Sequence, residues 1–175
     1  MIPVIIAIIA GVAVGIAIAG VYNNLVTLRN RMDNAWRDID AQLQRRIDLI
    51  PSLAKAVEGH VPGDDRAPAA VLEAHAELAG ATAPEQKVAA DDALSDALRQ
   101  LLADAERDPD LAADACFQQL KASIEDTESR VSYARMSHAD CVLAYNRAVR
   151  AFPGSLFAGI FQFKERTGFE TPAER

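Results

Sequence analysis

The stretch LVTLRNRMDNAWRDIDAQLQRRIDLIPSLAKAV, residues 25–57, carries the pattern on which the fold depends. Its apolar or small side chains recur every three or four positions, at Leu25, Leu28, Met32, Trp36, Ile39, Leu43, Ile47, Ile50, Ala54 and Val57. This spacing averages about 3.6 residues, the repeat of an α-helix with one apolar face. The stretch therefore predicts a long amphipathic helix that packs against other helices.

Charge and a proline interrupt this helix at Arg45, Arg46, Asp48 and Pro51. A proline inside a helix removes one backbone hydrogen bond and kinks the helix about one turn upstream, here near Ile47. The three charged side chains lie on the turn where the freed carbonyl needs a partner. We interpret the four residues as one unit, in which the proline bends the helix and the charges fix its register.

The segment Ile2–Val21, directly before this helix, contains no charged side chain. A run of about 20 apolar residues matches the ~30 Å hydrocarbon core of a bilayer, and soluble cores rarely hold a helix that is apolar on every face. We expect a transmembrane helix over residues 1–22 that continues into the amphipathic helix and ends near His60. A cleaved signal peptide is the alternative, because AIA before Gly20 resembles a cleavage site, although no basic residue precedes the run.

Small residues recur every four positions along the predicted span, at Ala7, Gly11, Gly15 and Ala19. Such a face allows two membrane helices to approach closely, so we expect it to self-associate and the protein to be a homo-oligomer. The alternative is that small residues are simply frequent in a span rich in Ala and Gly.

The orientation of the span follows from its flanking charges. Arg29, Arg31 and Arg37 follow the span and no Lys or Arg precedes it, which places the N-terminus outside and the helical body in the cytoplasm. Cys116 and Cys141 agree with a reducing compartment, since on one helix they would lie roughly 37 Å apart and could not form a disulfide.

The remaining chain predicts three more helices and no strand. Two are expected over residues 67–81 and 82–107, the second capped by Thr82. The last has a seam with strict 3,4 spacing, at Phe117, Leu120, Ile124, Thr127, Val131, Ala134, His138, Cys141, Tyr145, Ala148 and Phe152. A repeat of about 3.5 residues is typical of supercoiled packing. The predicted class is therefore all-α, with the transmembrane helix continuing into an elongated antiparallel bundle of about four long helices over residues 23–152.

The charge distribution and the C-terminal tail leave two questions open. Residues 58–114 hold 14 acidic and 4 basic side chains of a chain whose net charge is −7, which argues against nucleic-acid binding. This acidic middle is either a solvated face or a docking surface for a basic partner. The aromatic-rich tail, residues 153–175, either rests at the membrane interface or packs over the end of the bundle.

Four segments together resemble one protein family. They are YNNLVTLRNRMDNAWRDIDAQLQRRIDLIPSL (22–53), DPDL (108–111), ESRVSYAR (128–135) and YNRAVRAFPGSLFAG (145–159). With these motifs the chain resembles the LemA family of bacterial membrane proteins, over nearly its whole length. The resemblance implies one N-terminal helix in the bacterial cytoplasmic membrane and an elongated helical bundle, and it brings no catalytic residue.

The chain departs from the family pattern at three single positions and at the end of the first long helix, where GHVPGDD (59–65) replaces a more helical continuation. His138 and Ala139 stand where the family usually has Tyr-Asn, and Asp108 stands where a Tyr is frequent. His138 also lies on the predicted seam, where it is either a hydrogen-bonded core histidine or a pH-sensitive switch.

No residue pattern predicts catalysis. His60, His75 and His138 lack ligand spacing on one helix face, and no nucleophile or phosphate-loop motif is present in the sequence. We therefore expect a protein that is not an enzyme and needs no metal or cofactor.

Polar pairs between helices are a further expectation, because buried charges must be paired. One set places Asp33, Asp40 and Asp48 opposite Arg130, Arg135 or Arg147 of the last long helix. The other set places Arg45 or Arg46 opposite Glu125 or Glu128.

The expected function is a membrane-anchored scaffold or assembly protein that binds itself, the lipid bilayer or another membrane protein. The alternative is a membrane-bound regulator or adaptor of another membrane protein or protease, which responds to a signal through His138 or the acidic middle.

Overall fold

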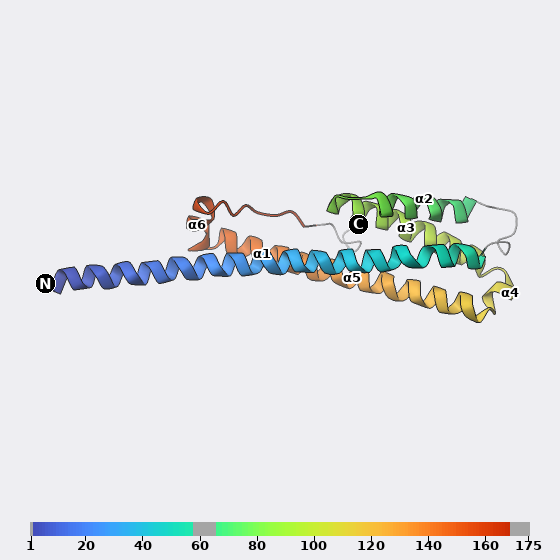
Figure 1. Cartoon of the computed structure of the whole chain (residues 1–175), viewed down its shortest axis with the longest axis horizontal. Coiled ribbons are helices and arrows are strands. Elements are labelled where there is room, and N and C mark those ends of the chain that lie inside the picture. The colour runs from blue at the N-terminus through green and yellow to red at the C-terminus, as the bar shows by residue number, and fades with distance from the viewer. Residues whose placement is uncertain (1, 58–65, 169–175) are drawn as a thin grey trace. The chain divides into compact units, whose positions relative to one another are not determined.

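The computed structural model describes residues 2–57 and 66–168, and it confirms the all-α class (Figure 1). The structure is 88% helical, with no strand in those two ranges. The helices are α1 (Ile2–Val57), α2 (Arg66–Gly80), α3 (Pro84–Ala105), α4 (Pro109–Ala112), α5 (Ala115–Arg150) and α6 (Gly154–Ile160). They form two compact units: a terminal unit, Met1–Arg37 with Arg135–Arg175, and a central unit, Asp38–Ala134.

The helix α1 is continuous from Ile2 to Val57, as the joined apolar and amphipathic patterns predict. Its N-terminal part is long and apolar enough to cross a membrane, and none of that window is buried. Pro51 lies inside the helix and is exposed, and the kink expected there stays a prediction. The helix end expected near His60 lies outside the described residues.

In the central unit, α1, α2, α3 and α5 alternate in direction. Lys87 pairs with Asp40, and Arg46 pairs with Asp91, so α3 runs in the same direction as α1. The helix α2 packs against α3 as an antiparallel hairpin. The helix α5 runs opposite to α3, with Lys121 near its start paired to Glu106 just after the end of α3. The predicted antiparallel bundle is confirmed within this unit.

Local sequence sets where two of these helices begin. Pro84 is the first residue of α3 and Ala83 is its N-cap, so the prediction that Thr82 caps this helix was wrong. The reason is that proline fits the first helical position, where its missing N–H is not needed. The DPDL segment forms the single turn α4, because the Asp108 carboxylate accepts hydrogen bonds from the backbone N–H groups of Asp110 (2.9 Å) and Leu111 (3.4 Å).

The seam of α5 is confirmed over most of its length and shifts near its end. Seven predicted members are buried: Phe117, Ile124, Thr127, Val131, Ala134, His138 and Tyr145. Leu120, Cys141 and Ala148 are only half-buried, and Phe152 is 80% exposed. Val142 and Val149 are buried in place of the last seam members. A strict 3.5-residue seam drifts by about 20° per heptad on a straight α-helix, so one position later meets the core.

The terminal unit joins the two ends of the described chain. Leu25 of α1, Tyr145 and Val149 of α5, and Ala158 of α6 form its buried apolar cluster. After α6 the chain continues as an extended segment, residues 161–168, which we call the strap.

Candidate functional site

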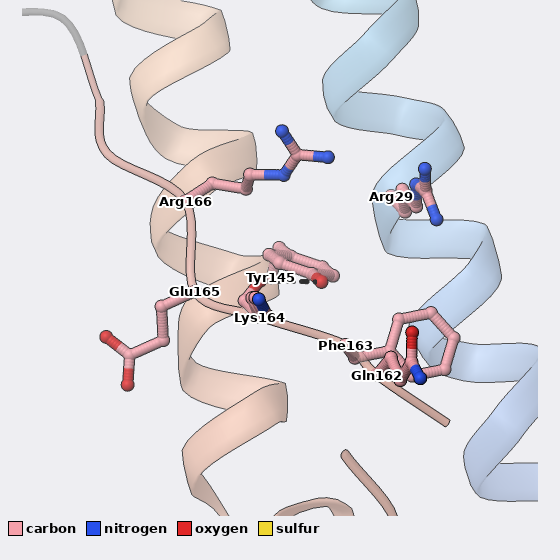
Figure 2. Close-up of a pocket in the computed structure, with 7 residues that line it drawn as sticks. All are labelled: Arg29, Tyr145, Gln162, Phe163, Lys164, Glu165 and Arg166. Atoms are coloured by element: carbon pink, nitrogen blue, oxygen red, sulfur yellow. Dashed lines mark hydrogen bonds between the residues drawn. The ribbon is translucent and has the colours of Figure 1, made fainter. Parts of the chain in front are cut away.

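The strap covers a cavity of about 340 Å³ in the terminal unit (Figure 2). Its lining residues come from α1, α5 and the strap itself: Arg29, Tyr145, Gln162, Phe163, Lys164, Glu165 and Arg166. The sequence predicted the aromatic character of this tail but not the cavity. A signal for it was the segment FQFKER (161–166), in which two Phe residues are followed directly by three charged residues without a helical period.

The end of α6 turns the chain back toward the cavity. Gln162 adopts a positive φ of 57°, and the Phe163 N–H donates to the Ala158 carbonyl at 2.9 Å. This is the Schellman arrangement, in which a left-handed residue ends a helix and the next N–H reaches back to the last turn. The strap therefore leaves α6 in a fixed direction.

Side chains of α5 hold the strap in place. The Tyr145 hydroxyl donates to the Lys164 carbonyl at 3.0 Å. The Asn146 amide donates to the Arg166 carbonyl at 2.7 Å and accepts from the Arg166 N–H at 2.9 Å. Burial raises the pKa of Tyr145, so its hydroxyl stays protonated and able to donate at neutral pH.

The cavity carries an excess of positive charge. Arg29, Lys164 and Arg166 contribute three cations, and Glu165 is the one acid in the lining. Glu165 points away from the other lining residues in Figure 2 and accepts from Nε of Arg150 at 2.9 Å. This hydrogen bond lowers the pKa of Glu165, so the carboxylate is charged and its charge is directed at Arg150.

An aromatic cluster fixes the strap and α6 against α1. Tyr22 lies directly after the apolar segment of α1, and its ring centroid is 5.1 Å from that of Phe161 and 5.9 Å from that of Phe163. Both pairs have the edge-on geometry that aromatic rings favour. The tail is thus anchored at the residue where the apolar segment ends.

A second polar site is buried in the central unit around Arg46. This side chain is fully buried, and its Nη1 donates to Asp91 Oδ1 at 2.7 Å and to Ser95 Oγ at 2.9 Å. Its Nη2 lies 3.7 Å from the Glu128 carboxylate, so the predicted meeting of Arg46 with Glu128 is present. Sequence reasoning missed Asp91 as the closer partner, although this acid interrupts the apolar face of α3 and so gave a signal.

Most other predicted polar pairs have different partners. Asp40 pairs with Lys87 of α3 and not with an arginine of α5. Asp48 accepts a hydrogen bond from Gln44 at 3.0 Å. For Asp48 a contact within α1 takes the place of the predicted contact between helices, because residues four apart on a helix are already neighbours.

The predicted partners on α5 follow the same rule. Arg130 donates to Asp126 at 2.8 Å, and Glu125 lies 3.8 Å from Lys121. Arg45 is exposed, and its charge contributes to the lowered pKa of Asp126, of which the hydrogen bond from Arg130 is the main cause. Arg135 is buried at 4% exposure.

His138 is buried on α5 in the terminal unit. Its ring packs edge-on against Trp36 of α1, with centroids 6.1 Å apart. Burial lowers the pKa of His138, and the carboxylate of Asp33 opposes this effect in part. The imidazole is therefore mainly neutral at pH 7.

A comparison with protein-family models gives a match to the LemA family over residues 35–175. The chain belongs to the LemA family. The match covers α2 to α6 completely and begins inside α1, so LemA membership rests on the bundle and the tail and not on the apolar segment. No curated protein matches the chain.

Two features complete the description of this LemA-family chain. Among residues 2–57 and 66–168, no three His, Cys, Asp or Glu side chains lie together in a way that could hold a metal ion. On the apolar segment, Gly11 and Gly15 have open space where a Cβ would stand, and Ala19 is exposed. The side chain of Ala7 lies outside the described part.

Proposed function

We propose that this LemA-family protein is a membrane-anchored, non-enzymatic scaffold whose helical body lies at the cytoplasmic face of the bacterial inner membrane. The observation that carries the proposal is the apolar N-terminal part of α1, of which none is buried. The same helix continues without a break into the bundle. A row of exposed Ile and Val side chains is unfavourable in water and favourable in lipid. The anchor and the bundle therefore share one continuous helix.

The cytoplasmic orientation rests on flanking charge. Arg29, Arg31 and Arg37 are all exposed after the apolar segment, and basic residues that flank a span favour the cytoplasmic side. The two free cysteines, Cys116 and Cys141, agree with a reducing compartment.

The scaffold role needs the chain to bind copies of itself or other membrane proteins. The face of Gly11 and Gly15 supports self-association, because no atom of residues 2–57 and 66–168 lies within 4 Å of a Cβ added to either glycine. Close approach of two backbones at such a face allows extensive van der Waals packing within the membrane.

The test is energy transfer between copies of the full chain in liposomes, labelled at the exposed Cys116 with Cys141→Ser removing the second thiol. We expect transfer above the level for random mixing, and we expect Gly11→Leu with Gly15→Leu to lower it several-fold. The matched control is Ala13→Leu with Ala17→Leu, which adds the same bulk on the opposite face of the helix. Transfer at the random level in the unsubstituted chain rules out self-association, and equal loss in both variants rules out this face.

A second candidate function, a regulator that responds to pH, is supported by His138. Its buried imidazole, close to Trp36 and Asp33, would gain a charge on acidification and disturb the packing of α1 on α5. If it is a switch, the same energy transfer changes between about pH 8 and pH 5.5, and His138→Gln removes the change. A flat profile in the unsubstituted chain excludes this candidate.

A further inference from the structure

The outer face of α6 carries an exposed apolar row. Leu156 and Ile160 lie on α6 and are 59% and 71% exposed, and Phe152, two residues before the helix, is 80% exposed. Gly154 and Ala158 of α6 are buried. Nine large apolar side chains are exposed among the described residues beyond Ile16, and four of them lie between Phe152 and Phe161. This concentration on α6 and the residues that flank it points to an occupant other than water.

The position of α6 points to the occupant. Tyr22, the first residue after the uncharged apolar segment, contacts Phe161 and Phe163, and Leu25 packs with Ala158. The helix α6 therefore lies beside the end of the apolar segment of α1. If that segment spans a bilayer, α6 lies at the level where lipid tails meet headgroups, and a tyrosine at the end of a span is typical of that level.

The charges of the strap fit the same surface. Arg29 is eight residues beyond Val21, or about 12 Å along α1 at 1.5 Å per residue. The headgroup layer extends roughly 5–8 Å beyond the hydrocarbon core on each side. Long basic side chains reach back toward such a layer, so the Arg29, Lys164 and Arg166 cations of the cavity lie within reach of lipid phosphates.

We propose that α6 and the strap form a second membrane contact beside the span, in which Phe152, Leu156 and Ile160 enter the lipid interface and Arg29, Lys164 and Arg166 bind the phosphates of anionic headgroups. This inference rests on the proposed membrane anchoring of α1. The occupant is the bilayer and not a protein partner, because the apolar row lies next to the exposed apolar segment of α1, which the proposed anchoring places in lipid. One face of α6 packs on α1 and α5 within the terminal unit, while the other enters the membrane.

The first experiment measures depth with the full chain in liposomes. A cysteine introduced by Leu156→Cys, with Cys116→Ser and Cys141→Ser, carries an environment-sensitive fluorophore that brominated lipid tails quench on contact. The matched control is Met136→Cys in the same background, because Met136 is 60% exposed on α5 and lies 16 residues, or about 24 Å along that helix, before Phe152.

We expect the probe at position 156 to be quenched at least about twofold more strongly than the probe at position 136, with a blue-shifted emission. Equal quenching at both positions overturns the proposal. Flotation of the same chain with the liposomes after alkaline extraction tests separately whether the apolar segment of α1 is inserted in the bilayer. A chain that fails to float refutes the anchor, and a chain that floats without quenching at position 156 refutes only the second contact.

The second experiment tests the headgroup. Quenching at position 156 is compared in liposomes with and without phosphatidylglycerol. We expect stronger quenching with the anionic lipid, and we expect Arg29→Gln, Lys164→Gln and Arg166→Gln together to abolish the difference. The control removes the same charge from exposed cations of the central unit, with Lys55→Gln, Arg99→Gln and Arg107→Gln. No effect of the anionic lipid, or equal loss in both variants, overturns the phosphate contact.

Discussion

Arg46 shows how one charged residue can belong to a core. It occupies a position of the buried face of α1, between Leu43 and Ile50, and no part of it is exposed. A guanidinium in this position is tolerable only because Asp91 and Ser95 lie at hydrogen-bond distance and Glu128 adds a second carboxylate. Such a group fixes the register of α1 against α3, since a shift of one turn would leave two charges unpaired.

The first prediction follows from this pairing. Arg46→Leu removes the guanidinium that pairs with the buried Asp91 carboxylate and is expected to lower the free energy of unfolding by about 3–5 kcal/mol, measured by denaturant unfolding followed by circular dichroism. The double variant Arg46→Leu with Asp91→Leu recovers most of this loss, because no unpaired charge remains. The exposed neighbour Arg45→Leu serves as the control and changes stability by less than about 0.5 kcal/mol. A single variant as stable as this control would contradict the pairing.

His138 gives a prediction for the dependence of stability on pH. Burial holds the pKa of the folded imidazole below its ordinary value of about 6.5. The unfolded chain therefore binds more protons in the window between the two values, and stability decreases as the pH falls from about 6.5 through the folded pKa. This contribution is fully present above about pH 6.5.

Trp36 is the single tryptophan of the chain and provides the measurement for this prediction. Its ring contacts His138, so its fluorescence should titrate with an apparent pKa below about 6.5, together with a decrease in melting temperature. His138→Gln removes both changes, and His75→Gln, a substitution of a half-buried histidine of α2, leaves them in place. If the pH dependence of the Trp36 fluorescence and of the melting temperature is unchanged in His138→Gln, another group causes it.

At the scale of elements, the attachment of α6 to α5 depends on one glycine. A Cβ on Gly154 would lie 2.1 Å from the Ala148 carbonyl oxygen, a contact that backbone atoms cannot relieve without moving. We expect Gly154→Ala to displace α6 and to lower the melting temperature. Its matched control is Gly159→Ala on the same helix, which meets open space and should be neutral or stabilising by up to about 1 kcal/mol.

Loss of order at α6 is measured by limited proteolysis of the tail. We expect faster cleavage after Gly154→Ala and unchanged or slower cleavage after Gly159→Ala. If both variants behave alike, the close approach of Gly154 to α5 does not determine how the tail is held.

The long helices were predictable from the sequence because their apolar repeats extend over many turns. The stripe from Leu25 to Val57 contains enough periods to define α1. An interhelical pair of Arg46 with Glu128 was among the predicted pairs, but the apolar stripe placed Ile47 and not Arg46 on the packed face of α1. Only the tertiary pairing with Asp91 of α3 reverses that assignment.

The short elements escaped prediction for a different reason. The helix α6 has seven residues, too few for a periodic signal, and α4 depends on the cap that Asp108 provides. The cavity beneath the strap arises from residues far apart in the chain, Arg29 and the segment 162–166. Local sequence patterns do not predict a contact between residues so far apart. The sequence does show the basic residues next to Phe161 and Phe163.

At the scale of the whole molecule, the proposed membrane attachment accounts for two features that are unfavourable in water. The apolar segment of α1 and the row on α6 both expose large aliphatic or aromatic side chains. They belong to the same compact unit and meet at Tyr22. Insertion into one bilayer would remove both apolar surfaces from water. This supports the proposal of a scaffold that contacts the bilayer at two places.

The last prediction concerns which side of the membrane holds the body. Positive-inside orientation, from Arg29, Arg31 and Arg37, places Cys116 in the cytoplasm, and this thiol is exposed. We expect a membrane-impermeant thiol reagent to leave Cys116 unlabelled in intact cells and to label it after permeabilisation. Cys141→Ser restricts the signal to one thiol, and a denatured sample gives the full signal. Labelling in intact cells would place the body outside, and the strap would then face the outer leaflet, where the anionic-lipid preference proposed for it would have to be tested anew.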